Sequence, residues 1–135
     1  MVTNKIVGAV FPLPHKTVER LLSKEKDVFT KFGRFKHLSK GQKLLFYDSS
    51  IHAIVGEAVI EEVTHADPSI VKAKYGSRLF LKSDEFDEYL SKTPLGSRSV
   101  QNKMMTICIL KNPKRYQHPQ KPAKKMNMIG HYVYE

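Results

Sequence analysis

The chain has 135 residues, the usual size of one domain, and we expect residues 1–135 to form a single domain. A chain of this length buries about two-thirds of its unfolded surface, so stability requires neither a disulfide nor a metal. The only cysteine, Cys108, lies in an apolar run, which excludes a disulfide framework and predicts a buried thiol. No stretch approaches the roughly 20 apolar residues of a membrane span, and the first residues lack a signal-peptide pattern, so we expect a cytoplasmic protein.

Charge is the most informative property of the composition. The 23 Lys and Arg residues against 13 Asp and Glu residues give a net charge of +10, and the excess is uneven. Residues 92–135 hold nine basic residues and one acid, whereas residues 1–91 are nearly balanced. A concentrated excess of positive charge favours the binding of polyanions. The composition therefore indicates a nucleic-acid partner, in preference to the alternative that the surface is basic only for solubility.

Taken in chain order, the first third predicts a strand and a helix. Residues 5–11 form an apolar run that ends at the turn-forming Pro12, which is typical of a strand. Residues 16–22 place their apolar side chains on one side, which predicts a short amphipathic helix. Over residues 24–35 the apolar residues recur at helical spacing, so we expect a helical turn that ends near Gly33.

The middle of the chain predicts a β-hairpin. A strand over residues 43–47 is followed by turn residues and by a longer strand over residues 52–63. One face of the longer strand carries the small residues Gly56 and Ala58. Small residues inside a strand allow another backbone or a bulky side chain to approach closely, as in a tightly curved sheet.

Two short helices with a strand between them are expected next. Asp67-Pro68 supplies an N-cap carboxylate and a proline at the first helical position, which predicts a helix over residues 69–75. Gly76 is the residue best suited to a left-handed position after that helix. A short strand over residues 78–81 and a second helix over residues 84–90 follow.

The last third predicts a turn over residues 94–96 and a β-rich strand over residues 103–110. Three prolines within residues 112–122 enforce extended, non-helical chain, and residues 128–134 can return as a last strand. The elements together predict an α+β fold, built as a small, mostly antiparallel, partly closed β-barrel flanked by short helices.

The order of three stretches resembles a known superfamily. Residues 41–47, 54–58 and 109–113 resemble the turn-strand, the long strand with its small residue, and the late strand of ASCH and EVE domains. The chain thus resembles the PUA-like pseudobarrel domains, which include PUA, ASCH, EVE and YTH, and looks closest to an uncharacterised, mainly archaeal family of that group. The resemblance implies a cleft between barrel and helices where RNA or a modified nucleobase is bound.

The resemblance does not carry over a catalytic role. ASCH domains carry a G-x-K-x-x-E-x-R pattern, and some of them hydrolyse modified nucleosides with the Lys and the Glu. This sequence matches the pattern at Gly41 and Lys43, but Phe46 stands at the Glu position and Asp48 at the Arg position. Because hydrolysis needs a general acid or base, we expect no catalytic residues and keep Lys43 as a binding residue.

Two clusters of cations with aromatics are the candidate nucleic-acid site. The helix-end group surrounds the end of the helix expected over residues 69–75 and consists of Lys72, Lys74, Tyr75 and Arg78. The late-strand group lies on the extended chain that follows the strand expected over residues 103–110 and consists of Lys111, Lys114, Arg115 and Tyr116. Cations engage phosphates, and tyrosines stack on unpaired bases. The alternatives are a solvated helix face with Tyr75 at the edge of the core, and an ordinary lysine-rich loop.

Three phenylalanines, Phe29, Phe32 and Phe35, lie among basic residues and are expected in the core, with their basic neighbours as a further candidate for the cleft edge. His65 and Asp67 could form half a metal site, but no Cys or paired His accompanies them. We therefore predict no metal and no cofactor.

The sequence favours a non-catalytic RNA-binding domain that recognises single-stranded, looped or modified RNA through a basic cleft. An enzyme of the hydrolase class, acting on a modified nucleoside or nucleotide in the same cleft, is the alternative. A module that binds an acidic protein partner is a third reading. The sequence leaves the oligomeric state open.

Overall fold

The computed structural model describes residues 6–32, 35, 37–92, 104–122 and 131–134. The described chain forms six strands and three helices, which are, in chain order, β1 (Ile6–Leu13), α1 (His15–Leu22), β2 (Val28–Phe32), β3 (Lys43–Asp48), β4 (Ala53–Ala66), α2 (Pro68–Tyr75), α3 (Ser83–Lys92), β5 (Met105–Gln120) and β6 (His131–Tyr134). Among these residues, no helix is long and apolar enough to cross a membrane.

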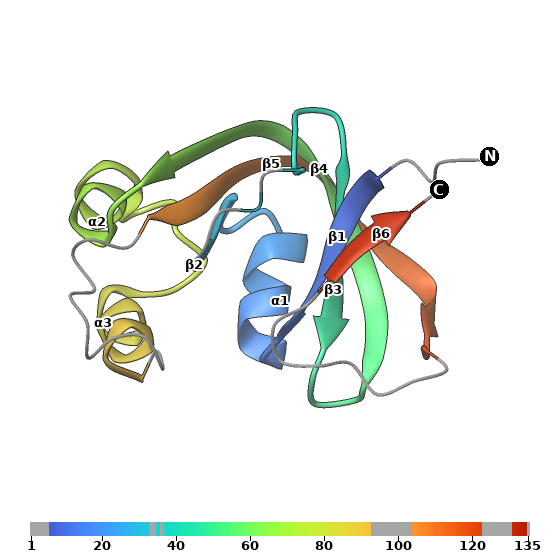
Figure 1. The fold of residues 1–135 in the computed structure, drawn as a ribbon. Coiled ribbons are helices and arrows are strands. Elements are labelled where there is room, and N and C mark those ends of the chain that lie inside the picture. Colours follow the sequence, from blue (N-terminus) through green and yellow to red (C-terminus); the bar gives the residue numbers. More distant parts are fainter. Residues whose placement is uncertain (1–5, 33–34, 36, 93–103, 123–130, 135) are drawn as a thin grey trace.

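All six strands join one sheet in the order β2-β5-β4-β3-β1-β6. The pair β1–β3 is parallel, and every other neighbouring pair is antiparallel. The long strands β4 and β5 curve across the molecule, and α2 and α3 lie together at one end of it (Figure 1). Three register shifts interrupt the β4–β5 pairing, and such bulges increase the bend of a strand. The predicted α+β fold with a mostly antiparallel sheet is therefore confirmed.

Helix α1 packs against the hollow side of the curved sheet, where it contacts β3, β4 and β5. Its buried face contributes Val18 and Leu21 to the core. A Cβ atom at Gly56 would lie 2.8 Å from the Leu22 side chain and 2.7 Å from the carbonyl oxygen of Lys114. Only glycine fits there, so the predicted close approach at the small residues of this strand is confirmed.

Most of the predicted elements are present. The structure has the first strand, the helix after it, and the hairpin, in which Lys43 of β3 pairs with Val59 of β4. Asp67 caps α2 by accepting a hydrogen bond from the backbone N–H of Ile70 at 3.1 Å. The late strand extends through the proline-rich segment to Gln120. The turn predicted over residues 94–96 lies outside the described residues.

Three local predictions are wrong. Residues 28–32 form strand β2 and not a helical turn, because they pair with β5. The strand is buried on both faces from Val28 to Thr30, so its sequence lacks the alternation of apolar and polar residues that would predict a strand. Residues 78–81 make only an isolated parallel bridge, between Leu79 and Val28. Gly76 has a right-handed conformation, with φ of −44°, so α2 does not end on a left-handed glycine.

The core is formed by one cluster of apolar side chains under the sheet. Its aromatic centre joins Phe11 to Phe29 and Phe29 to Phe80, with ring centroids 5.1 and 5.0 Å apart. Cys108 is fully buried, and burial raises the pKa of its thiol to about 12. The predicted buried thiol is thus confirmed.

Candidate nucleic-acid interface

The helix-end group lies on α2 and the turn after it, and acidic partners engage two of its cations. Lys72 pairs with Asp87 of α3 at 2.9 Å, and Arg78 donates to both carboxylate oxygens of Asp27. Tyr75 is 5% exposed and belongs to the core cluster. Burial leaves the ring of Tyr75 no open face for a base, so its geometry agrees with the alternative reading of this residue.

The late-strand group lies on β5, where Lys111 and Lys114 are exposed. Arg115 turns toward α1 and pairs with Glu19 at 2.6 Å. No acid stands near these cations in the sequence, yet one reaches Arg115 from a helix 96 residues earlier. The two lysines keep their ammonium groups in solvent, whereas the charge of Arg115 is partly offset.

Tyr116 and Lys43 meet at a carboxylate of β4. The Tyr116 hydroxyl donates to Glu57 Oε1 at 2.8 Å, and Lys43 Nζ lies 3.2 Å from Glu57 Oε2. Burial and the neighbouring Glu57 carboxylate raise the pKa of the Tyr116 phenol. The structure therefore brings Lys43 and the late-strand group together across β3, β4 and β5.

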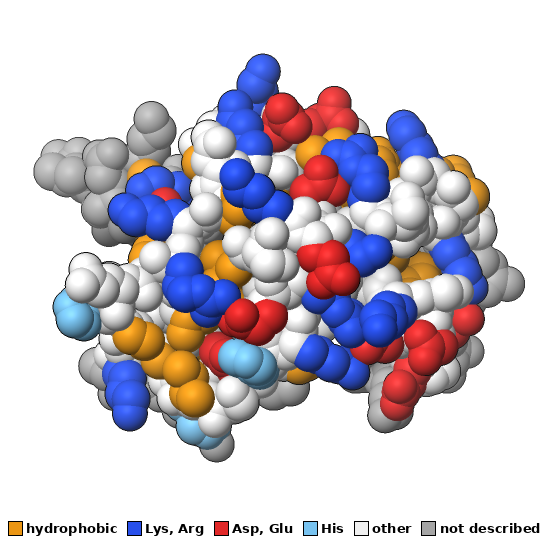
Figure 2. Space-filling model, turned by 180° about the vertical axis from the view of Figure 1, so that it is seen from behind, with side chains coloured by type: hydrophobic (Ala, Val, Ile, Leu, Met, Phe, Trp, Pro, Cys, Tyr) orange, Lys and Arg blue, Asp and Glu red, His pale blue; other side chains and the backbone are white. Residues whose placement is uncertain are grey.

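The surface carries mixed charge despite the net excess of cations. Figure 2 shows lysines and arginines spread over one face with carboxylates among them. Of the described lysines, those with exposed side chains and no hydrogen bond or ion pair to a carboxylate are Lys24, Lys40, Lys74, Lys82, Lys111, Lys114 and Lys121. These side chains are the ones free to meet phosphate, since they need not first leave a partner.

A mostly apolar cleft of about 330 Å³ separates the sheet from α3. It is lined by Pro12, Leu13, Pro14, Phe29, Thr30, Lys31, Phe80, Leu81, Glu85, Glu88 and Tyr89. A volume of this size falls at the lower end of small-molecule sites, which are usually apolar with a few placed polar groups. Phe29 is thus a wall of this cleft, and its basic neighbour Lys31 is at the cleft edge.

Two side chains give the cleft its polar character. Thr30 is only 1% exposed, and its buried hydroxyl has no hydrogen-bond partner among the described residues. Lys31 is half-buried with its ammonium 5.8 Å from the centre of the Phe11 ring, and burial lowers its pKa. Glu85 is already engaged, because hydrogen bonds from Arg20 and Lys16 hold its pKa far below the usual range.

The open edge of β2 faces the same cleft. Val28 exchanges backbone hydrogen bonds with the segment over residues 78–80, and the N–H of Phe32 donates to the Tyr89 hydroxyl at 3.2 Å. Thr30 lies between these two contacts, and alternate residues of an edge strand direct their backbone groups to the same side. The N–H and C=O of Thr30 therefore point toward the open edge of β2, on the side of the cleft.

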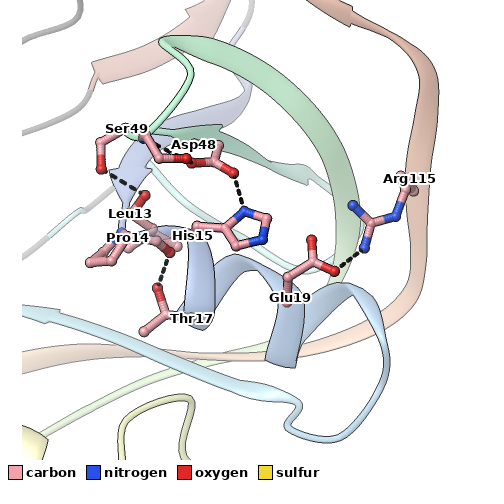
Figure 3. A network of polar contacts seen from close by, with 9 residues as sticks. Leu13, Pro14, His15, Thr17, Glu19, Asp48, Ser49 and Arg115 are labelled. Atoms are coloured by element: carbon pink, nitrogen blue, oxygen red, sulfur yellow. Dashed lines mark hydrogen bonds and ion pairs between the residues drawn. The ribbon is translucent and has the colours of Figure 1, made fainter.

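A histidine and a buried aspartate form a polar network between α1 and the end of β3 (Figure 3). Nδ1 of His15 lies 2.7 Å from Oδ2 of Asp48, whose other oxygen accepts from the N–H and hydroxyl of Ser50. The hydrogen bond to Asp48 raises the pKa of His15 above its usual 6.5. Burial alone would raise the pKa of Asp48, but the hydrogen bonds from Ser50 and His15 lower it.

This network was not predicted from the sequence. His15 and Asp48 lie 33 residues apart, and no motif links them. The ring of His15 is open to solvent on one side, and Glu19 and Arg115 form their ion pair one helical turn further along α1 (Figure 3). Asp48 fixes the orientation of the imidazole, so the exposed nitrogen can exchange a proton or bind an anion. Within the described part of the chain, no group of three or more His, Cys, Asp or Glu residues could hold a metal.

Two sequence comparisons identify relatives. Residues 6–135 match the sequence model of a family described as "Domain of unknown function (DUF365)". The "Uncharacterized protein MJECS03" of Methanocaldococcus jannaschii is 35% identical over 97 residues, which are 69% of this chain and 90% of that protein. An archaeal relative of this kind agrees with the predicted resemblance.

Solved structures show the same fold at low identity. The crystal structure of ASCH from Zymomonas mobilis has a TM-score of 0.68 at 18% identity, covering 85% of this chain and 73% of that chain. Protein EF3133 from Enterococcus faecalis, of the family DUF984, has a TM-score of 0.58 at 12% identity, covering 76% of this chain and 72% of that chain. The PUA-like fold predicted from the resemblance is confirmed, and the chain belongs to the DUF365 family.

Proposed function

We propose that the protein binds unpaired RNA, with one base in the cleft between β2 and α3 and the backbone on Lys111 and Lys114 of β5. We also propose that residues 1–135 act as a single PUA-like domain. The observation that carries the proposal is the cleft itself, which combines aromatic walls with the unpartnered hydroxyl of Thr30.

A nucleobase fits the chemistry of this cleft. Phe29, Phe80 and Tyr89 supply apolar and aromatic walls for a flat ring. Thr30 offers a hydroxyl and a backbone donor and acceptor, which match the polar edge of a base. A buried polar group without a partner costs about 1–3 kcal/mol, so a ligand that bonds the Thr30 hydroxyl recovers that free energy.

The excess of positive charge supports a polyanionic ligand. Lys111 and Lys114 on β5 are exposed and have no carboxylate partner among the described residues. Lysines of this kind attract the phosphate backbone of any sequence, while a base in the cleft would give the preference for unpaired strands. We expect a single-stranded oligonucleotide to bind more tightly than a continuous duplex.

A fluorescence-anisotropy titration with the variant Thr30→Val tests the proposal. Valine has nearly the shape of threonine, so the variant should be at least as stable as the wild type, because it removes an unsatisfied hydroxyl. Its affinity for single-stranded RNA should nevertheless fall. The matched control is Thr17→Val, since the buried Thr17 hydroxyl has a partner, the carbonyl of Pro14 at 2.8 Å.

Thr17→Val should lose stability and keep its RNA affinity, which is the opposite pattern. Unchanged RNA affinity in Thr30→Val, or equal affinity of the wild type for a duplex and a single strand, would count against a base in the cleft.

Lys31 favours a second candidate function, a hydrolase acting on a modified nucleoside in the same cleft. A half-buried amine with a lowered pKa is a common feature of catalytic lysines. Incubation with modified nucleosides, followed by mass spectrometry, tests this alternative. Product that forms with the wild type and not with Lys31→Met would establish the hydrolase; absence of product agrees with binding alone.

A further inference from the structure

A second pocket, of about 200 Å³, lies where the end of α1 meets β5. It is lined by Leu21, Lys24, Lys26, Asp27, Leu110, Lys111, Asn112 and Pro113. We name it the lysine pocket, because Lys24, Lys26 and Lys111 line it from two stretches of the chain, the segment between α1 and β2, and β5. Of its lining residues, the proposed function above uses only Lys111.

The charge of the lysine pocket is strongly positive. Its only acidic lining residue is Asp27, and both oxygens of that carboxylate accept hydrogen bonds from Arg78, at 2.9 and 2.8 Å. The charge of Arg78 therefore offsets that of Asp27, and the net positive charge of the lining comes from the three lysines. Like charges repel one another in a confined space, so an arrangement of this kind is stabilised by an anion.

Backbone geometry places two of the lysines. Asn112 has φ of 51° and lies where Val59 pairs with Lys111 and Glu57 with Lys114, so that β5 carries one residue more than β4. Such a bulge redirects the side chains beside it. Lys24 follows α1 with φ of 69°, a conformation that favours glycine. A lysine thus occupies a position where glycine would be the more stable residue.

The lysines are not needed to cap α1. The carbonyl oxygens of Glu19, Arg20 and Leu21 already accept backbone hydrogen bonds from Ser23, Lys26 and Lys24. The only lysine of the lysine pocket with a hydrogen bond from its ammonium is Lys26, which donates to Ser77 at 2.7 Å, within the described residues. Lys24 and Lys111 therefore have no structural partner there that explains their position.

We propose that the lysine pocket binds a phosphate group of the RNA backbone. Three ammonium groups and the Asn112 side chain can supply charge-assisted hydrogen bonds to its oxygens. This inference rests on the proposed RNA binding and deepens it. Asp27 at the lysine pocket and Thr30 at the cleft are three residues apart along the β2 segment, or about 10 Å. A phosphate and a base held at these two places can belong to neighbouring parts of one strand.

The test is a titration with inorganic phosphate at constant ionic strength, followed by NMR of backbone amides. The backbone amides of Leu110, Lys111 and Asn112 should shift in the wild type. In the triple variant Lys24→Gln, Lys26→Gln and Lys111→Gln, phosphate affinity should fall at least about tenfold, since each charge-assisted contact is worth that much. The matched control, Lys40→Gln with Lys82→Gln and Lys121→Gln, removes the same amount of positive charge from positions outside the lysine pocket. It should bind phosphate as the wild type does.

Equal loss of affinity in both triple variants, or no amide shift at Leu110, Lys111 and Asn112 in the wild type, would overturn the lysine pocket as a phosphate site. Oligonucleotides with and without a 5′-phosphate distinguish the source of the phosphate. If the triple variant loses affinity equally for both, the bound group is a backbone phosphodiester; if only the 5′-phosphorylated strand is affected, a terminal phosphate occupies the lysine pocket and the backbone assignment is wrong. Phosphate binding with no RNA binding at all would contradict the proposed function and leave the lysine pocket standing.

Discussion

At the scale of single residues, Asp48 shows how one position acquires a role that its neighbours in the sequence do not indicate. Its carboxylate is buried at the end of β3, where Ser50 and His15 provide three hydrogen bonds. A buried carboxylate with such partners remains ionised and favours the protonated form of the histidine beside it. The pair joins the start of α1 to β3, so the protonation of His15 is coupled to stability.

The first prediction concerns this coupling. The pKa of His15 is raised, so its contribution to stability is complete below pH 6.5 and is lost as the pH rises through the raised value. The pKa of Asp48 is lowered, so its contribution is present above its usual 3.8 and is lost as the pH falls through the lowered value. Denaturant unfolding of the wild type and of His15→Gln should differ most between these two limits, and the difference should shrink as the pH rises through the raised pKa of His15.

His15 is otherwise surrounded by Glu19, which raises its pKa, and Arg115, which lowers it. The variant Arg115→Gln should therefore keep the pH dependence, because the hydrogen bond to Asp48 is the larger cause. A difference between wild type and His15→Gln that does not change with pH would show that the pair is not coupled to folding.

The second prediction concerns Tyr116. Its hydroxyl bonds Glu57, so Tyr116→Phe should lower the free energy of unfolding by about 1 kcal/mol, the usual net value of such a hydrogen bond. The ring remains, so RNA affinity should change little, whereas Tyr116→Ala should weaken RNA binding if the ring stacks on a base. Chemical denaturation and anisotropy measure the two effects separately. Equal RNA affinity in wild type and Tyr116→Ala would remove the stacking role.

At the scale of elements, a substitution at the end of α1 is expected to raise stability and to lower phosphate affinity. Lys24 has a left-handed conformation that costs a non-glycine residue about 1–2 kcal/mol, so Lys24→Gly should raise the free energy of unfolding by about 1 kcal/mol. The same change removes an ammonium group from the lysine pocket and should lower phosphate affinity. Lys24→Ala is the control, since it loses the charge and keeps the strain. A destabilised Lys24→Gly variant would show that the lysine supports the fold.

The elements also show which features a sequence can predict. The hairpin of β3 and β4 and the cap of α2 were predicted because turn residues, alternation and Asp67 act locally. β2 was missed because burial from Val28 to Thr30 removes its alternation, and only its pairing with β5 makes it a strand. Local sequence patterns predict local structure. An edge strand whose conformation depends on pairing with a distant strand carries too weak a local pattern to be predicted.

The candidate site follows the same rule. Lys111 and Lys114 could be found from the charge of the sequence, and both are exposed on β5. The partners Glu19 of Arg115 and Glu57 of Tyr116 are 96 and 59 residues away, so no spacing predicts them. The cleft was implied by the resemblance, but its polar group, Thr30, is an ordinary strand residue in the sequence.

At the scale of the whole molecule, the net charge is +10, yet carboxylates lie among the cations on the face that Figure 2 shows. Ion pairs join Arg20 to Glu85, Arg78 to Asp27 and Arg115 to Glu19, and these pairs hold the packed elements to one another. Among the residues that the structure describes, the positive charge that remains for a ligand is carried mainly by unpaired lysines. RNA affinity should therefore depend on a few defined positions and not on the total charge.

The last prediction measures that dependence through salt. Each lysine that neutralises a phosphate of a single strand contributes about 0.7 to the slope of log affinity against log salt, because a counterion is released. The double variant Lys111→Gln and Lys114→Gln should reduce the slope by about 1.4 if both lysines contact phosphate. Adding Arg115→Gln should reduce it by less than another 0.7, because the guanidinium already neutralises Glu19 at 2.6 Å. The control, Lys40→Gln with Lys82→Gln, removes the same net charge and should leave the slope nearly unchanged; an equal reduction in the control would mean that RNA responds only to the total charge.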